Sequence, residues 1–597
     1  MEHEANSVAL LPSPDVHNHV HKPDGQNQPR RSSNHTETNR RSRKPLRRRL
    51  LSEGGAVYVI ALGLYLVIAY FVDFKYTAAN GDAFSRMANG FYVLYSRDPH
   101  LAAIGFVWEP LTSIADMVFL LGNHLWPALA RNDMAGSLTS ATFMAGAGYQ
   151  LLSALREWGL GRAPRLVLTT FFILNPMIVF YGGNGMSEGL YLFTLVTATR
   201  YLLRWVHTDD LRSLAYGAIA LGFSYLTRNE AVGAIVAGSV GVALVSYWRN
   251  KGQRSERRAT ALADAAIFAV PGVISAVGWA VASYVITGSP FGALAKGNET
   301  SRQHVLLAAI PFSQRTIYVF HVVTSQWPFI PVVLVIAVIL AIRRHDARIL
   351  APLTVLGGAL SFDVLIYLMA DLEPYYRYFI VTIPLEMLLV GSVVVSVSPD
   401  GDAGIRNPRL TPWSIKGRGL RCVGAVLLVL VLTGPSVITT AATMFNNKIA
   451  PEEAQPLGFI FDSHPSGSAL SYAERYPTIL KFSSYLDGLH LPNGDVLVDN
   501  VTGCVPEIII TSSQPDLFVI PNDRDFQRAL ADPLTFHVHY ILDPNPSGSG
   551  PAAPNTTYST LWNTGAGFAK AIHQLIPARG SCPEFRLFRV FGHPNHA

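Results

Sequence analysis

Asp82 and Arg86 are the residues of this chain that most directly suggest chemistry. Both follow the first strongly apolar segment, in the stretch Gly81-Asp82-Ala83-Phe84-Ser85-Arg86, where we expect the chain to leave a membrane. A carboxylate at the water interface can stay ionised and still reach a polar group carried by a lipid. On a helix through this stretch, Arg86 lies one turn away on the same face. The pattern indicates an enzyme with a carboxylate base, although Asp is also a favoured helix cap.

Two arginines at predicted helix ends are suited to hold a phosphate. Arg228 lies in Leu226-Thr227-Arg228-Asn229-Glu230, and Arg377 lies in Tyr375-Tyr376-Arg377-Tyr378. A guanidinium group recognises phosphate through paired hydrogen bonds, so both arginines are predicted to bind a donor phosphate. The alternative for Arg377 is that it anchors its helix at the interface beside the tyrosines.

Further polar residues are candidates for binding an acceptor or a divalent metal. They are Glu188, Glu230, Arg86 and Asp371. Glu188 opens a predicted helix, where an acid also complements the helix dipole. The sequence has no Walker motif, no glycine fingerprint for a nucleotide and no zinc-protease motif. We therefore expect no certain cofactor, and the participation of a divalent metal stays open.

The composition indicates that membrane helices position these residues. The chain has 597 residues, of which 49% are hydrophobic and 15% are charged, whereas soluble proteins have about 25% charged residues. Apolar runs close to the ~20 residues that cross a bilayer recur from Val57 to about Thr440. Examples are Val57–Val72, Leu166–Tyr181, Ala231–Tyr247, Ala265–Ile286, Phe329–Ile342 and Val423–Ile438. The predicted fold class is mainly α, a polytopic bundle of membrane helices.

Positive charges predict how often the chain crosses. If Leu111–Leu129 spans the membrane, the loop Arg156–Arg165 and the later basic loops fall outside. That segment also contains Asp116, Asn123, His124 and Pro127. The positive-inside rule therefore favours about eleven spans, with Leu111–Leu129 lying along the surface or against other helices. This choice places the N terminus in the cytoplasm and gathers the candidate residues on the outer face.

The chain divides into three predicted parts. Residues 1–50 are rich in arginine and polar residues, which predicts a disordered cytoplasmic tail attracted to anionic lipid. No aromatic residues alternate with these arginines, so nucleic acid is not expected as a partner. Residues 51–444 form the membrane module, with a first outer loop at 75–135. Residues 445–597 are polar and are predicted to lie outside the cell, which gives a multi-pass protein of the plasma membrane.

The C-terminal part is predicted to be an α/β domain. Short β-type runs occur at Asp495–Val498, Glu507–Thr511, Asp516–Ile520, Phe536–Leu542 and Phe585–Val590. Helical patterns occur near Tyr472–Leu486, Asp525–Ala531 and Gly567–Leu575. Such alternation favours a sheet with a parallel component. Cys504 and Cys582 both fall in this domain, and two cysteines in an exported domain could form a disulfide.

The order of these features resembles the C-type (GT-C fold) superfamily of membrane glycosyltransferases, which use polyprenyl-phosphate sugars. The similar elements are the acid in the first outer loop, Asn175-Pro176, Ser187-Glu188, Arg228-Asn229-Glu230 and Arg377-Tyr378, and they extend from about Val57 to Ser396. Unlike some members, this chain has one acid and not an adjacent pair at Asp82. It also lacks the Trp-Trp-Asp motif of oligosaccharyltransferases, which disfavours transfer of a whole glycan to asparagine.

The resemblance and the residues together predict an inverting hexosyl- or pentosyltransferase. It would move a sugar from a polyprenyl-phosphate donor to a hydroxyl of a glycan, lipid or protein on the outer face, with Asp82 as general base. The alternative is a transporter or flippase for lipid-linked glycans, or a scaffold that presents the outer domain. Asp363, an acid in the middle of a predicted span, is the residue that favours transport.

Overall fold

The structure is a computed structural model that describes residues 53–290, 307–397, 418–547 and 552–594. The chain divides into two units, Met1–Arg49 and Leu50–Ala597. The predicted basic tail at 1–50 lies outside the described residues. Both the predicted membrane module and the predicted C-terminal domain belong to the second unit, which is the part described below.

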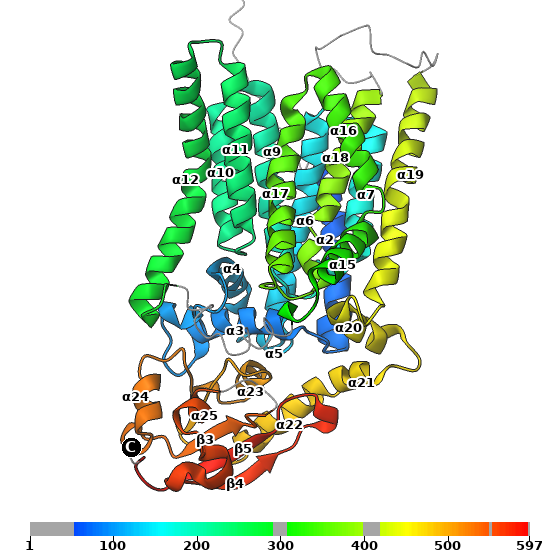
Figure 1. Ribbon diagram of the computed structural model, residues 1–597. Coiled ribbons are helices and arrows are strands. Elements are labelled where there is room, and N and C mark those ends of the chain that lie inside the picture. The colour runs from blue at the N-terminus through cyan, green and yellow to red at the C-terminus, as the bar shows by residue number, and fades with distance from the viewer. Residues whose placement is uncertain (1–52, 291–306, 398–417, 548–551, 595–597) are drawn as a thin grey trace, which may run out of the picture. The chain divides into compact units, whose positions relative to one another are not determined.

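Long helices side by side form the bundle in Figure 1. Their bounds are α2 (Glu53–Ala69), α6 (Met134–Glu157), α7 (Arg162–Leu174), α9 (Glu188–Thr208), α10 (Leu211–Tyr225), α11 (Ala231–Arg249), α12 (Arg254–Thr287), α15 (Phe312–Gln326), α16 (Ile330–Arg344), α17 (Leu350–Leu368), α18 (Thr382–Val397) and α19 (Arg418–Met444). The centre of the bundle is apolar, and α18 is its most deeply buried helix.

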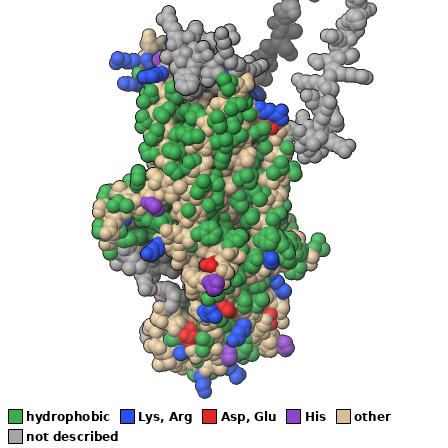
Figure 2. Space-filling model, turned by 90° about the vertical axis from the view of Figure 1, so that its right-hand side faces the viewer, with side chains coloured by type: hydrophobic (Ala, Val, Ile, Leu, Met, Phe, Trp, Pro, Cys, Tyr) green, Lys and Arg blue, Asp and Glu red, His purple; other side chains and the backbone are tan. Residues whose placement is uncertain are grey.

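Six helices in the described ranges are long and apolar enough to cross a membrane. A seventh span results if α15 and α16, which are bent by 73° at a short break, are counted as one. Figure 2 shows hydrophobic side chains over most of this face of the bundle, as expected for a multi-pass membrane protein. The count of about eleven spans stays a prediction, since α6, α9 and α10 are less apolar than a typical span.

Basic loops meet at one end of the bundle. Arg165 Nε donates to Glu53 Oε1 at 2.8 Å, and Arg348 Nη1 donates to the backbone oxygen of Trp158 at 3.2 Å. The first contact joins α7 to the start of α2, and the second joins the 3-10 turn η3 (Ala347–Ile349), just before α17, to Trp158 at the end of α6. Two of the basic segments that the positive-inside rule groups together, around Arg165 and Arg348, therefore lie at the same end of the described bundle, whereas the side of the membrane they occupy stays a prediction.

Short helices cover the opposite end of the bundle (Figure 1). They are α3 (Gly81–Tyr95), α4 (Pro110–Leu120) and α5 (Ala128–Arg131). The segment Leu111–Leu129, which we expected not to cross, forms α4 and α5 here. α3 buries Phe84, Met87 and Phe91 along one face, and it begins at Asn80, whose side chain caps the helix. The segment 75–135, which we predicted to be the first outer loop, therefore forms a layer of short helices against the bundle.

The C-terminal part continues with α20 (Pro451–Phe461), α21 (Gly467–Ala473) and α22 (Arg475–Asp487). In the described residues a five-stranded sheet follows, with the order β2-β1-β3-β5-β4. Its strands are β1 (Val496–Val498), β2 (Phe518–Val519), β3 (Tyr540–Pro544), β4 (Ala569–Leu575) and β5 (Phe585–Val590). β2, β1 and β3 are parallel, and β5 and β4 run antiparallel. The predicted α/β character and the parallel component are both present.

Two segments of this domain differ from the sequence expectation. Glu507–Thr511 was expected as a strand but belongs to the helix α23 (Val505–Thr511), which has Pro506 in its first turn and buries all its residues. Gly567–Leu575 was expected to be helical, but most of it is the edge strand β4, paired with β5. Cys504, directly before α23, forms a disulfide with Cys582. Tertiary packing overrides local propensity in both segments.

Ion pairs attach the C-terminal domain to the layer around α3. Arg97 Nη2 lies 3.0 Å from Asp523 Oδ2, and Arg524 pairs with Asp98. The Tyr472 hydroxyl donates to the backbone oxygens of Ala78 and Ala79, both at 3.0 Å. The domain therefore holds the segment that leads into Asp82.

Candidate active site

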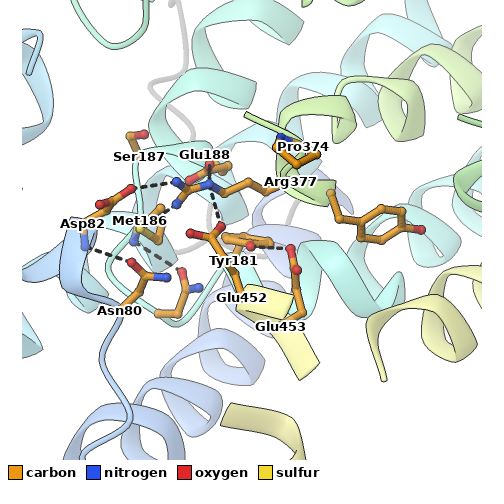
Figure 3. Close-up of polar contacts among 12 residues, drawn as sticks. Asn80, Asp82, Tyr181, Met186, Ser187, Glu188, Pro374, Arg377, Glu452 and Glu453 are labelled. Atoms are coloured by element: carbon orange, nitrogen blue, oxygen red, sulfur yellow. Dashed lines mark hydrogen bonds and ion pairs between the residues drawn. The ribbon is translucent and has the colours of Figure 1, made fainter. Parts of the chain in front are cut away.

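Arg377 is the centre of a cluster of charged residues at the end of the bundle that carries α3 (Figure 3). It lies in the 3-10 turn η4 (Tyr376–Phe379), directly before α18, and only 1% of its side chain is exposed. Its Nη2 donates to Asp82 Oδ2 at 2.7 Å. Its Nε lies 3.0 Å from Glu452 Oε2 and 3.9 Å from Glu188 Oε1. Three carboxyls from α3, α9 and α20 thus surround one guanidinium group.

Asp82 is held with its carboxylate toward Arg377. Its backbone N–H donates to the side chain of Asn80 at 2.8 Å, so Asn80, and not Asp82, is the cap of α3. The capping interpretation of Asp82 is therefore wrong, and its side chain is available for other contacts. Burial opposes its ionisation, but the charges of Arg377, Arg86 and Arg228 outweigh burial and hold the pKa of Asp82 below its ordinary value.

Arg228 lies between α10 and α11 and forms a second group with two acids. Its Nη1 donates to Glu188 Oε1 at 2.7 Å, and its Nε donates to Glu230 Oε1 at 3.1 Å. Glu188, which is 1% exposed, is thus close to both Arg228 and Arg377. The structure brings together Asp82, Arg228, Arg377, Glu188 and Glu230, which the sequence predicted separately.

The glycine-rich loop before α9 positions Glu188. A Cβ at Gly183 would lie 2.7 Å from the backbone oxygen of Tyr65, so only glycine fits against α2 there. Ser137 Oγ, on α6, donates to the Gly183 oxygen at 3.2 Å. Met186 in this loop places its sulfur 3.5 Å from Arg377 Nη1. The loop therefore positions both Glu188 and the sulfur atom of Met186 that contacts Arg377.

Arg86 contributes charge without pairing directly with Asp82. It is 5% exposed, and its guanidinium carbon lies 3.9 Å from the ring centre of Trp108. Its Nη1 lies 3.8 Å from the sulfur of Met186, on the side of the loop that Arg377 also contacts. Asp371, by contrast, is exposed in the segment between α17 and η4.

Glu452 and Glu453 were missed by the sequence analysis. Both lie in the first turn of α20, and Glu453 is fully buried and accepts a hydrogen bond from the Tyr181 hydroxyl at 2.5 Å. Burial raises the pKa of Glu452 to about 8, although Arg377 opposes the shift, and burial raises the pKa of Glu453 to about 7. The signal was present in Pro451-Glu452-Glu453, an acid pair that opens a helix just after the last apolar segment.

Two of the acids that the sequence offered for an acceptor or a metal contact an arginine. Glu188 and Glu230 each direct an oxygen at Arg228. Within the described ranges, no group of three or more His, Cys, Asp or Glu side chains is arranged to hold a metal ion.

Asp363, the residue that favoured transport, is buried in α17. It is close enough to Glu230 and Arg228 to be affected by their charges. This acid, which we predicted at mid-span, thus lies within the electrostatic reach of the cluster around Arg228.

No family model and no curated protein sequence matches the chain. Among solved structures, ArnT from Cupriavidus metallidurans bound to undecaprenyl phosphate is 13% identical, with a TM-score of 0.46, over 89% of this chain and 97% of that one. The archaeal oligosaccharyltransferase AglB from Archaeoglobus fulgidus, in complex with an inhibitory peptide and a dolichol-phosphate, is 11% identical, with a TM-score of 0.40, over 82% of this chain and 69% of that one. The chemistry assigned to this chain therefore comes from its own residues.

Proposed function

We propose that this protein is an inverting membrane glycosyltransferase that moves a sugar from a polyprenyl-phosphate donor to a hydroxyl group on the outer face. The acceptor hydroxyl belongs to a glycan, a lipid or a protein. The observation that supports this proposal is the contact between Arg377 and Asp82, which joins a phosphate-binding group to a carboxylate at the end of an apolar bundle.

The two arginines suit a lipid-linked phosphate because both are nearly removed from water. Arg228 and Arg377 have 8% and 1% of their side chains exposed. A charge-assisted hydrogen bond to phosphate is strong in such surroundings, since little water competes for the oxygens. The donor's polyprenyl chain would remain among the apolar helices while its phosphate reaches the arginines.

In the proposed reaction Asp82 removes the proton of the acceptor hydroxyl. The acceptor oxygen then attacks the anomeric carbon from the face opposite the phosphate, and the carbon–oxygen bond to the phosphate breaks. Arg228 and Arg377 hold the phosphate as its charge increases. No step requires a metal, which agrees with the engagement of Glu188 and Glu230 by Arg228.

The test uses the purified full-length protein in nanodiscs with radiolabelled polyprenyl-phosphate sugars. The wild type should release label from one donor, and Asp82→Asn should abolish release while the protein keeps its melting temperature. Asp98→Asn is the matched control, since Asp98 is an outer-loop acid that pairs with Arg524 and should be dispensable for transfer. An active Asp82→Asn enzyme would exclude Asp82 as the base. Movement of an intact donor between leaflets would support the transporter alternative.

A further inference from the structure

Two nitrogens of the Arg377 side chain contact two different carboxyl groups. An arginine fork is shaped to bind two oxygens of one phosphate or one carboxylate. Here Nη2 contacts Asp82 at 2.7 Å and Nε lies 3.0 Å from Glu452. Figure 3 shows the two acids approaching the guanidinium group from α3 and α20. A phosphate bound to Arg377 would therefore have Asp82 and Glu452 as its immediate neighbours.

The surroundings of these two acids favour opposite protonation states. The charges of Arg377, Arg86 and Arg228 together hold the pKa of Asp82 below its ordinary value. Glu452 is only 16% exposed, and its pKa is raised to about 8 by burial and by the charges of Asp82, Glu453 and Glu188. When neighbouring carboxyls differ in this way, the ionised one can serve as base and the neutral one as acid.

Resting on the proposed function, we propose that Glu452 is a second catalytic residue. As a neutral carboxyl it donates a hydrogen bond to the phosphate oxygen that leaves the sugar. Because it is neutral, it does not repel the anionic donor that Arg377 binds. It is also the member of the pair that comes from the C-terminal part of the chain, so α20 completes a site that α3 begins.

The step is balanced without another reactant. The acceptor oxygen forms the new bond to the anomeric carbon, and its proton goes to Asp82. The bond between that carbon and the phosphate oxygen breaks, and its electron pair stays on the oxygen. The proton of Glu452 stays on Glu452, because a phosphate monoester releases its second proton near pH ~6. The hydrogen bond strengthens as the leaving oxygen gains charge.

Among the titratable groups around Glu452, Glu452 itself is the one expected to lose its proton just above pH 7.5. These groups are Arg377, Asp82, Glu188, Glu453, Tyr181, Tyr375 and Tyr472. The pKa of Glu453 is raised by burial only to about 7, so Glu453 is mostly ionised above that pH. Tyrosines ordinarily ionise near pH ~10, and burial raises the pKa values of Tyr375 and Tyr472 further.

The experiment measures kcat and kcat/KM from pH 7 to pH 9.5 for the wild type, Glu452→Gln and Glu452→Ala. Wild-type kcat/KM should fall with a midpoint near pH 8, where Glu452 of the free protein loses its proton. Glu452→Gln keeps a hydrogen-bond donor at every pH, so its kcat at pH 7 should stay within about tenfold of the wild type, and its kcat/KM should lack the alkaline decrease. Glu452→Ala should lose roughly 10²–10³-fold in kcat, as when one donor to a developing charge is removed.

Glu453→Gln is the matched control, because Glu453 is the adjacent buried acid but contacts Tyr181 and not Arg377. It should keep the alkaline decrease. The inference is overturned if Glu452→Gln shows the same alkaline decrease as the wild type, or if Gln costs as much activity as Ala. A wild type that consumes no polyprenyl-phosphate sugar would contradict the proposed function itself, so the two failures are distinguishable.

A binding measurement keeps the inference testable even if a variant fails to fold. Farnesyl phosphate is already a dianion at pH 7.5, so Glu452 is the group that titrates above this pH. Wild-type affinity for farnesyl phosphate should weaken between pH 7.5 and pH 9.5, while the affinity of Glu452→Gln should not. Unchanged wild-type affinity over this range would contradict the role of Glu452.

Discussion

The carboxylate of Asp82 contacts Arg377, yet 33% of the Asp82 side chain is exposed. Its pairing with Arg377 keeps it ionised at neutral pH, but a carboxylate held by a guanidinium group is also a weak base. If the donor phosphate binds Arg377, it competes for the donor group that now contacts Asp82. Donor binding would then make Asp82 more basic when the acceptor arrives, because the stabilising contact of its charged form is lost.

Arg86 provides a test of the electrostatic control of Asp82. Its positive charge helps to lower the pKa of Asp82, so Arg86→Gln should raise that pKa. In the proposed reaction, activity needs ionised Asp82 and is lost as the pH falls through this pKa. The acid limb of kcat/KM should therefore move to higher pH in Arg86→Gln. Arg86→Lys keeps the charge and should leave the acid limb in place; a shift of equal size in both variants would contradict the electrostatic explanation.

At the level of residues, the sequence identified groups whose type was unusual for their expected position. Asp82, Arg228 and Arg377 stood out because ionisable residues are rare at the ends of apolar helices. It could not show that one guanidinium contacts both Asp82 and Glu452, because these acids are 370 residues apart, from 82 to 452. Nor could it distinguish Asn80 from Asp82 as the helix cap, since both types cap helices well.

The packing of α9 against α6 controls the position of Glu188. A Cβ at Gly189 would lie 2.6 Å from the backbone oxygen of Ser140, so the two helices touch at this glycine. Gly189→Ala should push α9 away from α6 and displace the adjacent Glu188, at a cost of about 1–3 kcal/mol of stability. The expected result is a lower melting temperature together with reduced kcat.

Gly63→Ala in α2 is the control for this change, because nothing lies within 4 Å of the added Cβ. It should leave the melting temperature unchanged or raise it slightly, since alanine favours a helix over glycine by about 1 kcal/mol. If the two alanine variants melt alike, the close contact between α9 and α6 is not what positions Glu188.

At the level of elements, the length of an apolar segment predicted its secondary structure better than local residue propensity did. The strongly apolar segments around α2, α11, α12 and α19 are helices, as their length predicted. Val505–Thr511 became a helix despite three consecutive isoleucines, because Pro506 opens it and it packs between α22 and α3. For Ala569–Leu575, pairing with β5 decided the conformation, and a single sequence does not display that pairing.

At the level of the whole molecule, ion pairs connect the C-terminal domain to the layer around α3 within one compact unit. The Asp523 side chain is fully buried, and its oxygen is paired with Arg97. Burial raises the pKa of Asp523 to about 6 despite this arginine, which shows how much the carboxylate depends on its partner. The domain therefore contacts both the loop after α3 and the segment that leads into Asp82.

Removing Arg97 should loosen this attachment. Arg97→Ala leaves the buried Asp523 without its partner, and breaking a buried pair in this way costs about 3–5 kcal/mol. Arg524→Ala removes an exposed partner of Asp98 and should lower the melting temperature much less, because solvent screens exposed ion pairs. Melting temperatures of both variants, measured with the transfer rate, check this expectation. If both variants lower the melting temperature equally, the buried pair of Arg97 and Asp523 does not stabilise the protein more than the exposed pair of Arg524 and Asp98.

The contact between Glu452 and Arg377 also means that the cluster can form only late in synthesis of the chain. Asp82 emerges early in synthesis, but α20 follows it by 370 residues, from 82 to 452, and comes after the last apolar helix. At translation rates of about 5–20 residues per second, this interval lasts roughly 20–70 s. During that time the nascent chain holds Arg377 or Asp82 without the complete set of partners. The segment that begins at Pro451 thus completes the cluster last, since a chain truncated before Pro451 would contain the helices up to α19 yet lack Glu452.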